Sequence, residues 1–174
     1  MLDLIKMREA IQQRTIKDDP VLSGKEGERL AVECCEKVGI SLCTVNQMPD
    51  TFPEELKSYG GKRPDFIVDT DMQKLVAVID AKYHQTNDLE DFTLQNEELD
   101  KYSGLKTFLK DLSGEVEVWV IFMVFPKEAS GQSYTVIELE EMLLGEDSTL
   151  AGKPAKKVTL EGKLMKFGSE QLAK

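Results

Sequence analysis

Residues 62–84 read KRPDFIVDTDMQKLVAVIDAKYH and decide the fold. Two runs rich in apolar and β-branched residues, 65–69 and 74–83, are separated by a short polar turn, which is the pattern of a β-hairpin. The second run is apolar on both faces, as expected for a strand that is covered on both sides. The stretch therefore predicts an antiparallel pair of strands whose second member lies inside a larger sheet.

The segments around this hairpin predict helices that cover a mixed sheet. In chain order we expect a helix over 2–17, a helix from the capping-box pattern at Ser23 to Gly39, a segment 40–45 compatible with a strand, a long, partly ordered loop over 46–62, the hairpin, a helix over 91–112, a central strand over 116–125 and a short helix over 137–144. The tail from Ala151 gives no clear prediction. This order indicates a single α/β or α+β domain over residues 1–174.

The composition limits the class of protein. The chain has 174 residues, and 32 acidic against 22 basic side chains give a net charge of −10, which excludes broad electrostatic attraction to nucleic acid but allows a local basic groove. Its three cysteines form no disulfide or zinc pattern, so we expect a cytoplasmic, reducing environment. No apolar run reaches about 18 residues, so no transmembrane helix is expected.

Charged residues stand at the ends of the two hairpin strands. Asp65 opens the first strand, while Asp80 and Lys82 close the second. Residues two apart in a strand point to the same face, so Asp80 and Lys82 should project side by side, and Asp65 can face Asp80 across the hairpin. Neighbouring buried carboxylates repel each other unless a cation binds between them, and magnesium prefers such oxygen ligands.

Two further polar residues lie on helix faces that are otherwise apolar. At 100° per residue, Glu28 shares a face with Ala31, Val32 and Cys35, so it should point inward. In the predicted helix over 91–112, Gln95 shares the apolar stripe that contains Leu99, Tyr102 and Leu109. Because an inward-facing acid needs a partner, Glu28 is a candidate third carboxylate of a shared metal site.

These residues resemble a known signature. Pro64-Asp65, followed after an apolar strand by Asp80-Ala81-Lys82, resembles the PD-(D/E)xK nuclease superfamily. Gly24-x-x-Gly27-Glu28 resembles the glutamate-bearing helix that precedes the signature in that family. Gln95 and Tyr102 stand on the later helix, where the family often has a glutamine or a tyrosine.

The resemblance covers about residues 23–126 and implies a restriction-endonuclease-like fold. The expected order of elements is similar to the αβββαβ core of the family, with the helix over 1–19 and the extension 127–174 as additions. The compact architecture looks like that of Holliday-junction resolvases and small restriction-type endonucleases. The implied activity is hydrolysis of phosphodiester bonds by an endonuclease, with DNA favoured over RNA and a homodimer as a compatible assembly.

The resemblance also implies a role for each site residue. Asp65, Asp80 and the backbone carbonyl of Ala81 would bind one or two Mg²⁺ or Mn²⁺ ions, and Glu28 would complete the site directly or through water. Lys82 would help to activate the attacking water.

Several polar residues nearby are candidate contacts to nucleic acid. Lys62, Arg63 and His84 flank the signature and could touch phosphates, or they could be solvated. Viral cap-snatching endonucleases resemble this chain in the same elements and have a lysine on the later helix, a place that Lys101 would take. Lys153, with the nearby Lys156 and Lys157, forms a small basic group in an acidic half of the chain.

A second class of function stays open on the sequence alone. A protein with a net charge of −10 can serve as a non-catalytic interaction, inhibitor or immunity-type protein on a nuclease-like fold, with a basic partner. The complete set of Glu28, Asp65, Asp80 and Lys82 favours the enzyme, because a degenerate copy has no reason to keep all four.

Overall fold

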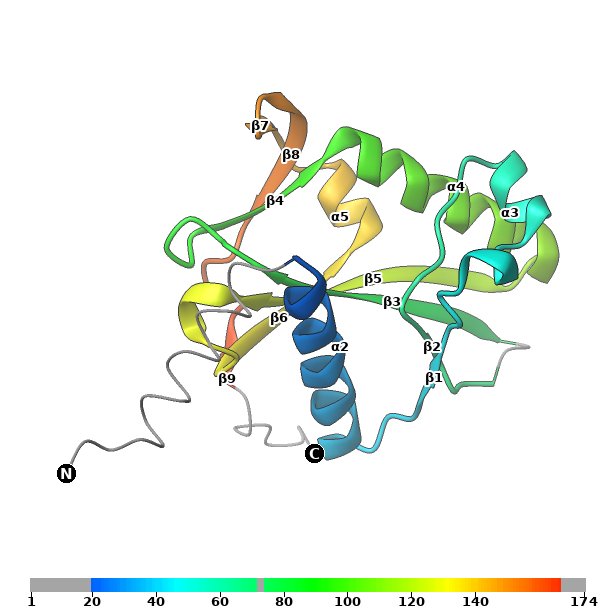
Figure 1. The fold of residues 1–174 in the computed structure, drawn as a ribbon, viewed down its shortest axis with the longest axis horizontal. Helices are drawn as coiled ribbons and strands as arrows, with labels where there is room; N and C mark the ends of the chain where they lie inside the picture. The colour runs from blue at the N-terminus through cyan, green and yellow to red at the C-terminus, as the bar shows by residue number, and fades with distance from the viewer. Residues whose placement is uncertain (1–19, 72–73, 167–174) are drawn as a thin grey trace.

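The computed structural model of the chain describes residues 20–71 and 74–166 as a mixed α/β fold (Figure 1). Its helices and strands are α2 (Pro20–Lys37), β1 (Leu42–Thr44), η1 (Pro49–Thr51), α3 (Glu54–Ser58), β2 (Phe66–Val68), β3 (Leu75–His84), β4 (Asp91–Gln95), α4 (Asn96–Ser113), β5 (Glu117–Pro126), η2 (Lys127–Ala129), β6 (Ser133–Glu138), α5 (Leu139–Leu143), β7 (Glu146–Leu150), β8 (Lys153–Thr159) and β9 (Met165–Lys166). The expected helix over 2–17 lies outside the described residues.

The larger sheet has the strand order β1-β2-β3-β5-β6-β9. The predicted hairpin is present, because β2 pairs antiparallel with β3 through Phe66↔Ile79 and Ile67↔Val78. Strands β3 and β5 pair in parallel from Leu75↔Glu117 to His84↔Pro126. A parallel pair needs a crossover, which β4 and α4 supply. Both strands that were predicted to be central are therefore interior strands of the sheet.

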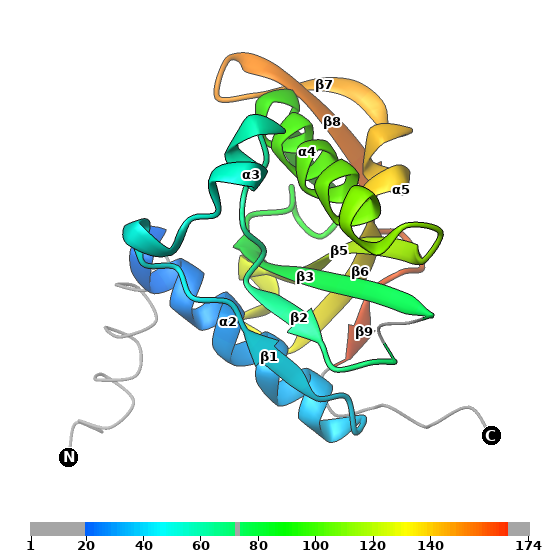
Figure 2. The same cartoon turned by 90° about the vertical axis from the view of Figure 1, so that its right-hand side faces the viewer.

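Helices cover both faces of this sheet, as Figure 2 shows for α2 and α4. Alternate residues of β3 point to opposite faces. Ile79, Ala81 and Tyr83 pack in the core beneath α2, whereas Val78 packs in the core beneath α4 and α5. Asp80 and Lys82 continue the second set, so both project towards α4.

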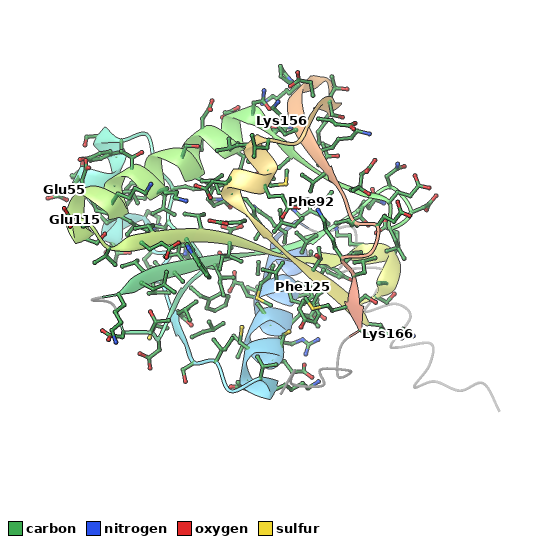
Figure 3. All side chains as sticks on the ribbon, turned by 180° about the vertical axis from the view of Figure 1, so that it is seen from behind. Glu55, Phe92, Glu115, Phe125, Lys156 and Lys166 are labelled. Carbon is green, nitrogen blue, oxygen red and sulfur yellow. The ribbon has the colours of Figure 1, made fainter. Side chains whose placement is uncertain are left out.

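The C-terminal part of the chain builds a second sheet, of order β4-β8-β7. Strand β8 pairs with β4 on one side and with β7 on the other, so β7 and β8 form a hairpin. Phe92 of β4 is fully buried beneath it, and Phe125 is fully buried in the core on the α2 side. Figure 3 labels both residues, together with Lys156 on the hairpin. The tail from Ala151, for which the sequence gave no clear prediction, therefore supplies β8, the middle strand of this second sheet.

The predicted helix over 91–112 was wrong in its first five residues. Residues 91–95 form β4, and α4 begins at Asn96. Phe92 and Leu94 are buried while their neighbours are partly exposed, a period of two that pairing with β8 selects over the helical period. Gln95 therefore lies at a strand end and not on a helix stripe.

Other predicted boundaries also differ from the structure. Helix α2 begins at Pro20, ahead of the capping-box pattern at Ser23; proline is tolerated in a first helical turn, where its missing N–H has no helical acceptor. The loop over 46–62 contains η1 and α3. Of the predicted helix 137–144, the first two residues end β6, and α5 covers Leu139–Leu143.

Candidate active site

The site begins where β3 extends beyond its partner strand. Pairing with β2 ends at Ile79, yet β3 continues to His84. Just before β2, the Asp65 N–H donates to the Ile79 carbonyl at 3.0 Å. The Asp65 Oδ2 atom then accepts the Ala81 N–H at 2.8 Å. The Asp65 side chain therefore takes the place of a missing ladder partner and is fixed beside Asp80, as the sequence predicted.

A glycine lets α2 cover the rest of this free edge. A Cβ atom on Gly27 would lie 3.3 Å from the Tyr83 nitrogen and 3.5 Å from the Ala81 carbonyl oxygen. This close approach of helix and strand backbone brings the next residue, Glu28, to the end of β3. The inward direction predicted for Glu28 agrees with this placement.

These elements enclose a cleft of about 610 Å³. Figure 1 shows the start of α2 near the end of β3, with β4 on the other side. The cleft is lined by Gly24, Glu28, Lys62, Asp65, Asp80, Ala81, Lys82, Tyr83, His84, Gln85, Asn87, Asp91, Thr93, Lys127 and Leu150. All five residues predicted to hold the metal or activate water thus line a single cleft.

Two lysines bind the carboxylates on the α4 side of the cleft. The Lys82 Nζ atom lies 2.8 Å from Asp80 Oδ2 and 2.5 Å from Glu98 Oε1. The Lys62 Nζ atom lies 3.2 Å from the same Glu98 oxygen and 3.6 Å from Asp80 Oδ1. Because Lys82 is only 7% exposed and Asp80 4%, the Lys82–Asp80 pair within this network is sheltered from solvent screening.

The network fixes the charge states of its members. Burial alone would lower the pKa of Lys82, but Asp80 and Glu98 outweigh it and raise that pKa. Burial would likewise raise the pKa of Glu98, but Lys82 and Lys62 bring it down to about 2. Lys82 therefore stays protonated. Its ammonium group is suited to donating hydrogen bonds and stabilising negative charge rather than to removing a proton.

The pKa of Asp65 is shifted in the opposite direction to that of Glu98. Burial, together with the charges of Asp80 and Glu28, raises the pKa of Asp65 to about 7, although the Ala81 N–H and Lys82 act in the other direction. Its carboxylate thus carries a negative charge at neutral pH only at a cost. A perturbed acid of this kind inside a cleft is typical of functional sites.

The donor chemistry of the cleft fits a divalent cation. Asp65 and Asp80 offer carboxylate oxygens, and a cation beside them would relieve the repulsion that raises the Asp65 pKa. Magnesium needs only one or two carboxylates, with water and substrate phosphate as its other ligands. Within residues 20–71 and 74–166, no three His, Cys, Asp or Glu side chains form a ready-made ligand cluster. Asp80 would therefore have to exchange a lysine partner for the ion.

The structure divides the other predicted contact residues into two groups. Lys62 and His84 line the cleft. Tyr102 is fully buried on Phe122, with ring centroids 4.7 Å apart, and its hydroxyl donates to Glu98 Oε1 at 3.4 Å. Burial beside Asp80 and Glu98 holds the pKa of Tyr102 well above its usual value.

Tyr102 is buried and does not line the cleft, and three further predicted contacts also lie outside it. Gln95 donates to the Leu150 carbonyl at 3.2 Å, and Lys101 pairs with Glu97 at 2.9 Å on an exposed turn of α4. The Arg63 guanidinium donates to the carbonyls of residues 46–48 at 2.8 to 2.9 Å. Arg63 therefore stabilises the loop before α3 instead of facing the acidic residues.

Glu98 is the site residue that the sequence reasoning missed. It lies one helical turn before Tyr102, and the spacing Glu98-x-x-x-Tyr102 places both on the face of α4 that looks towards β3. Its contacts to Lys82 and Lys62 come from segments distant in the sequence. The spacing was the available signal, but only the fold reveals its lysine partners.

Comparison of the chain with known protein families and curated proteins does not assign it to a family. No protein-family model matches the chain, and no curated protein matches it either. In the described part of the chain, no helix is both long and apolar enough to cross a membrane.

Proposed function

We propose that this protein is a metal-dependent nuclease, an endonuclease that hydrolyses phosphodiester bonds. The observation that carries the proposal is the convergence of Glu28, Asp65, Asp80 and Lys82 on one cleft. They come from α2, the residue before β2, and the end of β3. The order α2-β1-β2-β3-α4-β5, with β4 inserted before α4, supports a restriction-endonuclease-like core.

The reaction needs water and a phosphodiester as its only reactants. The water oxygen forms a new bond to phosphorus while the bond from phosphorus to the leaving sugar oxygen breaks. One proton of the water is lost to solvent, and the leaving oxygen takes one up. A Mg²⁺ or Mn²⁺ ion held by Asp65 and Asp80, with Glu28 and the Ala81 carbonyl as further ligands, would supply Lewis-acid stabilisation of the phosphate.

Lys82 and Lys62 supply the positive charge that the protein itself brings to this reaction. Both ammonium groups border the carboxylate of Asp80, at 2.8 and 3.6 Å. Because Lys82 is held in its charged form, its role is to donate a hydrogen bond to the attacking water or to a phosphate oxygen. Glu98 is a positioning residue that aims both lysines.

The first test is cleavage of a mixed panel: single-stranded DNA, duplex DNA, a four-way junction and RNA, each with Mg²⁺, with Mn²⁺ and with EDTA. We expect metal-dependent cutting that the Asp80→Ala variant loses by roughly 10³-fold or more, since a metal supplies several kcal/mol and each 1.36 kcal/mol is tenfold in rate. Asp100→Ala, which removes an exposed carboxylate on α4 outside the cleft, is the matched control.

Two results would overturn the proposal. An Asp80→Ala variant that cuts at the parent rate would remove the cleft from the reaction. Failure to cut any substrate, together with no heat on calorimetric titration of Mn²⁺, would instead favour an acidic interaction protein, which the net charge of −10 allows.

A further inference from the structure

The first half of β5 has an open edge. Strand β6 pairs with β5 only over residues 121–124, so within the described residues no strand flanks residues 117–120 on that side. The chain leaves the sheet at Leu139, which is buried in the core on the α4 side. On its other side, this part of β5 pairs with β3. An interior strand of the sheet therefore has unpaired backbone on one side over residues 117–120.

A groove of about 590 Å³ follows this edge. Its lining includes the consecutive residues 117–119, whose side chains point alternately to the two faces of the sheet. A hollow lined by consecutive strand residues runs beside their backbone and not over one face. Such an edge offers N–H and C=O groups to an extended chain, which can add to the sheet as a further strand.

The groove carries more negative than positive charge. It is lined by Glu115, Glu117, Glu138 and Glu140 against Lys106 and Lys110; Glu115 is labelled in Figure 3. Lys106 is already paired with Glu140 and lies 3.8 Å from Glu138. Burial, together with Glu140 and Glu117, raises the pKa of Glu138, although Lys106 acts in the other direction. The lysines of the groove therefore leave its carboxylates only partly compensated, and a cationic group from outside would be attracted to them.

A tryptophan borders the same groove. Trp119 is 40% exposed, and its indole N–H donates to Glu117 Oε1 at 2.7 Å. The two side chains lie on one face of β5 because they are two residues apart. An arginine can stack on an exposed indole ring while its charge meets a nearby carboxylate. Tryptophan is also enriched among the residues that contribute most to protein–protein binding.

We propose that this edge binds an extended, basic segment of a partner protein, which adds to the sheet as a strand beside residues 117–120. The inference goes beyond the proposed nuclease function and does not depend on it, because the cleft lies at the opposite end of β3 and β5. A second copy of this chain is a poorer occupant. Pairing two such edges would bring Glu117 and Glu138 towards their counterparts, and like charges that face each other across an interface repel.

A synthetic peptide tests the edge directly. The probe is a short peptide, capped at both ends, that alternates arginine and valine. The chain has a single tryptophan, Trp119, so its fluorescence reports binding at this groove. We expect the arginine peptide to change this fluorescence, and the same peptide with glutamate in place of arginine to bind at least about tenfold more weakly, because its charge is repelled. Unchanged fluorescence with the arginine peptide at every soluble concentration would overturn the proposal.

Methylation of the peptide backbone separates strand addition from general attraction of charge. One version carries a methyl group on every arginine backbone nitrogen, and another on every valine backbone nitrogen. Alternate residues of a paired strand direct their backbone groups to the partner, so only one of the two versions should lose affinity, by about tenfold for two lost hydrogen bonds. Equal affinity of both methylated versions and the parent peptide would contradict edge pairing.

Reversal of charge tests the carboxylates of the groove. The double variant Glu117→Lys and Glu138→Lys should bind the arginine peptide about tenfold more weakly, since two attractions become repulsions. Glu36→Lys with Asp100→Lys, at exposed carboxylates outside the groove, gives the same net charge and is the matched control. Equal weakening in both double variants would mean that only the total charge matters and would overturn the site.

The free protein tests the other occupants. Backbone amides of residues 117–120 that do not pair with β3 should exchange quickly with solvent and become protected when the peptide binds. Slow exchange of these amides in the monomeric protein without peptide would mean that a segment of the chain itself covers the edge. A dimer, measured by sedimentation, that the Glu117→Lys and Glu138→Lys variant alters would assign the edge to a second copy. Either result would overturn the assignment to a basic partner.

Discussion

The two sides of the cleft hold carboxylates in opposite electrostatic states. On the β2 side, burial and the nearby Asp80 raise the pKa of Asp65 to about 7. On the α4 side, Lys82 and Lys62 outweigh burial and lower the pKa of Glu98 to about 2. Both side chains flank the same buried aspartate, so burial alone does not decide their charge. The difference comes from where the fold places its lysines.

This asymmetry suggests a division of labour. On the β2 side, the charges of Asp80 and Glu28 act on Asp65 more strongly than the charge of Lys82, so it is the side on which a divalent ion would relieve repulsion. The α4 side already carries two ammonium groups around Glu98, at 2.5 and 3.2 Å, and is suited to phosphate oxygens. Asp80 lies between the two sides and belongs to both.

The largest loss of turnover should follow from removal of Lys82, which contacts both Asp80 and Glu98. Under the proposed function, Lys82→Ala would remove a preorganised hydrogen-bond donor at the reacting phosphate, so turnover should fall by roughly 10²-fold or more. Manganese binding, measured by calorimetry, should be retained because the carboxylates remain. Lys106→Ala, which removes another partly buried lysine paired with Glu140, controls for loss of an ion pair. Unchanged turnover in Lys82→Ala would exclude this lysine from the mechanism.

The next largest effect should be a dependence of metal binding on pH that the β2 side imposes. A proton on Asp65, whose pKa is about 7, competes with the ion. Mn²⁺ affinity should therefore rise by roughly 20- to 30-fold between pH 5.5 and 7.5, with release of a proton. Calorimetry in two buffers of different ionisation enthalpy measures both quantities. An affinity that is flat over this range would contradict the state assigned to Asp65.

The same carboxylate makes the stability of the metal-free protein depend on pH. The folded-state pKa of Asp65 lies above its ordinary value of 3.8, so the folded state binds the extra proton between these values. Its contribution to stability is fully present below about pH 4 and is lost as the pH rises through about 7. Asp65→Asn should remove this loss, which thermal unfolding at pH 5.5 and pH 8 would detect.

A smaller effect should follow from a change on the α4 side. Glu98→Gln keeps the shape of the side chain but removes the charge that holds Lys82 and Lys62, so kcat should fall about tenfold, the scale of a lost outer-shell contact. KM for a nucleic acid substrate should not rise, because both lysines remain. Asp100→Asn on the same helix, which changes an exposed carboxylate outside the cleft, is the matched control. A change confined to KM would argue that Glu98 does not position Lys82.

The same contrast explains what the sequence could predict. Local patterns located the acid-rich side: strand alternation placed Asp80 beside Lys82, and helical periodicity turned Glu28 inward. The α4 side depends on contacts between distant segments. In the sequence, residues 91–95 resemble the start of a helix. In the structure they pair with β8, a strand some sixty residues later. Lys62 meets Glu98 only because the loop after α3 packs on α4.

That loop packs on α4 through a glycine, which yields the smallest predicted effect. A Cβ atom on Gly104 would lie 2.3 Å from the Tyr59 carbonyl oxygen and 3.0 Å from the Gly61 nitrogen. Ala is favoured over Gly within a helix by about 1 kcal/mol, yet overpacking typically costs about 1–3 kcal/mol. Gly104→Ala should therefore destabilise the protein by up to about 2 kcal/mol in denaturant unfolding, as backbone atoms have little room to move.

Gly24→Ala is the matched control in α2, since a Cβ atom at this position would have no heavy atom within 4 Å, and the same change should stabilise the protein by up to about 1 kcal/mol. Lys62 directly follows Gly61, which packs on Gly104, whereas Asp65 at the end of the same loop is held to β3 by hydrogen bonds with Ile79 and Ala81. Gly104→Ala should therefore raise KM for nucleic acid while Mn²⁺ affinity stays at the parent value. Stabilisation by both substitutions would mean that the loop is not held against α4. A loss of Mn²⁺ affinity in Gly104→Ala would mean that the two sides of the cleft are not independent.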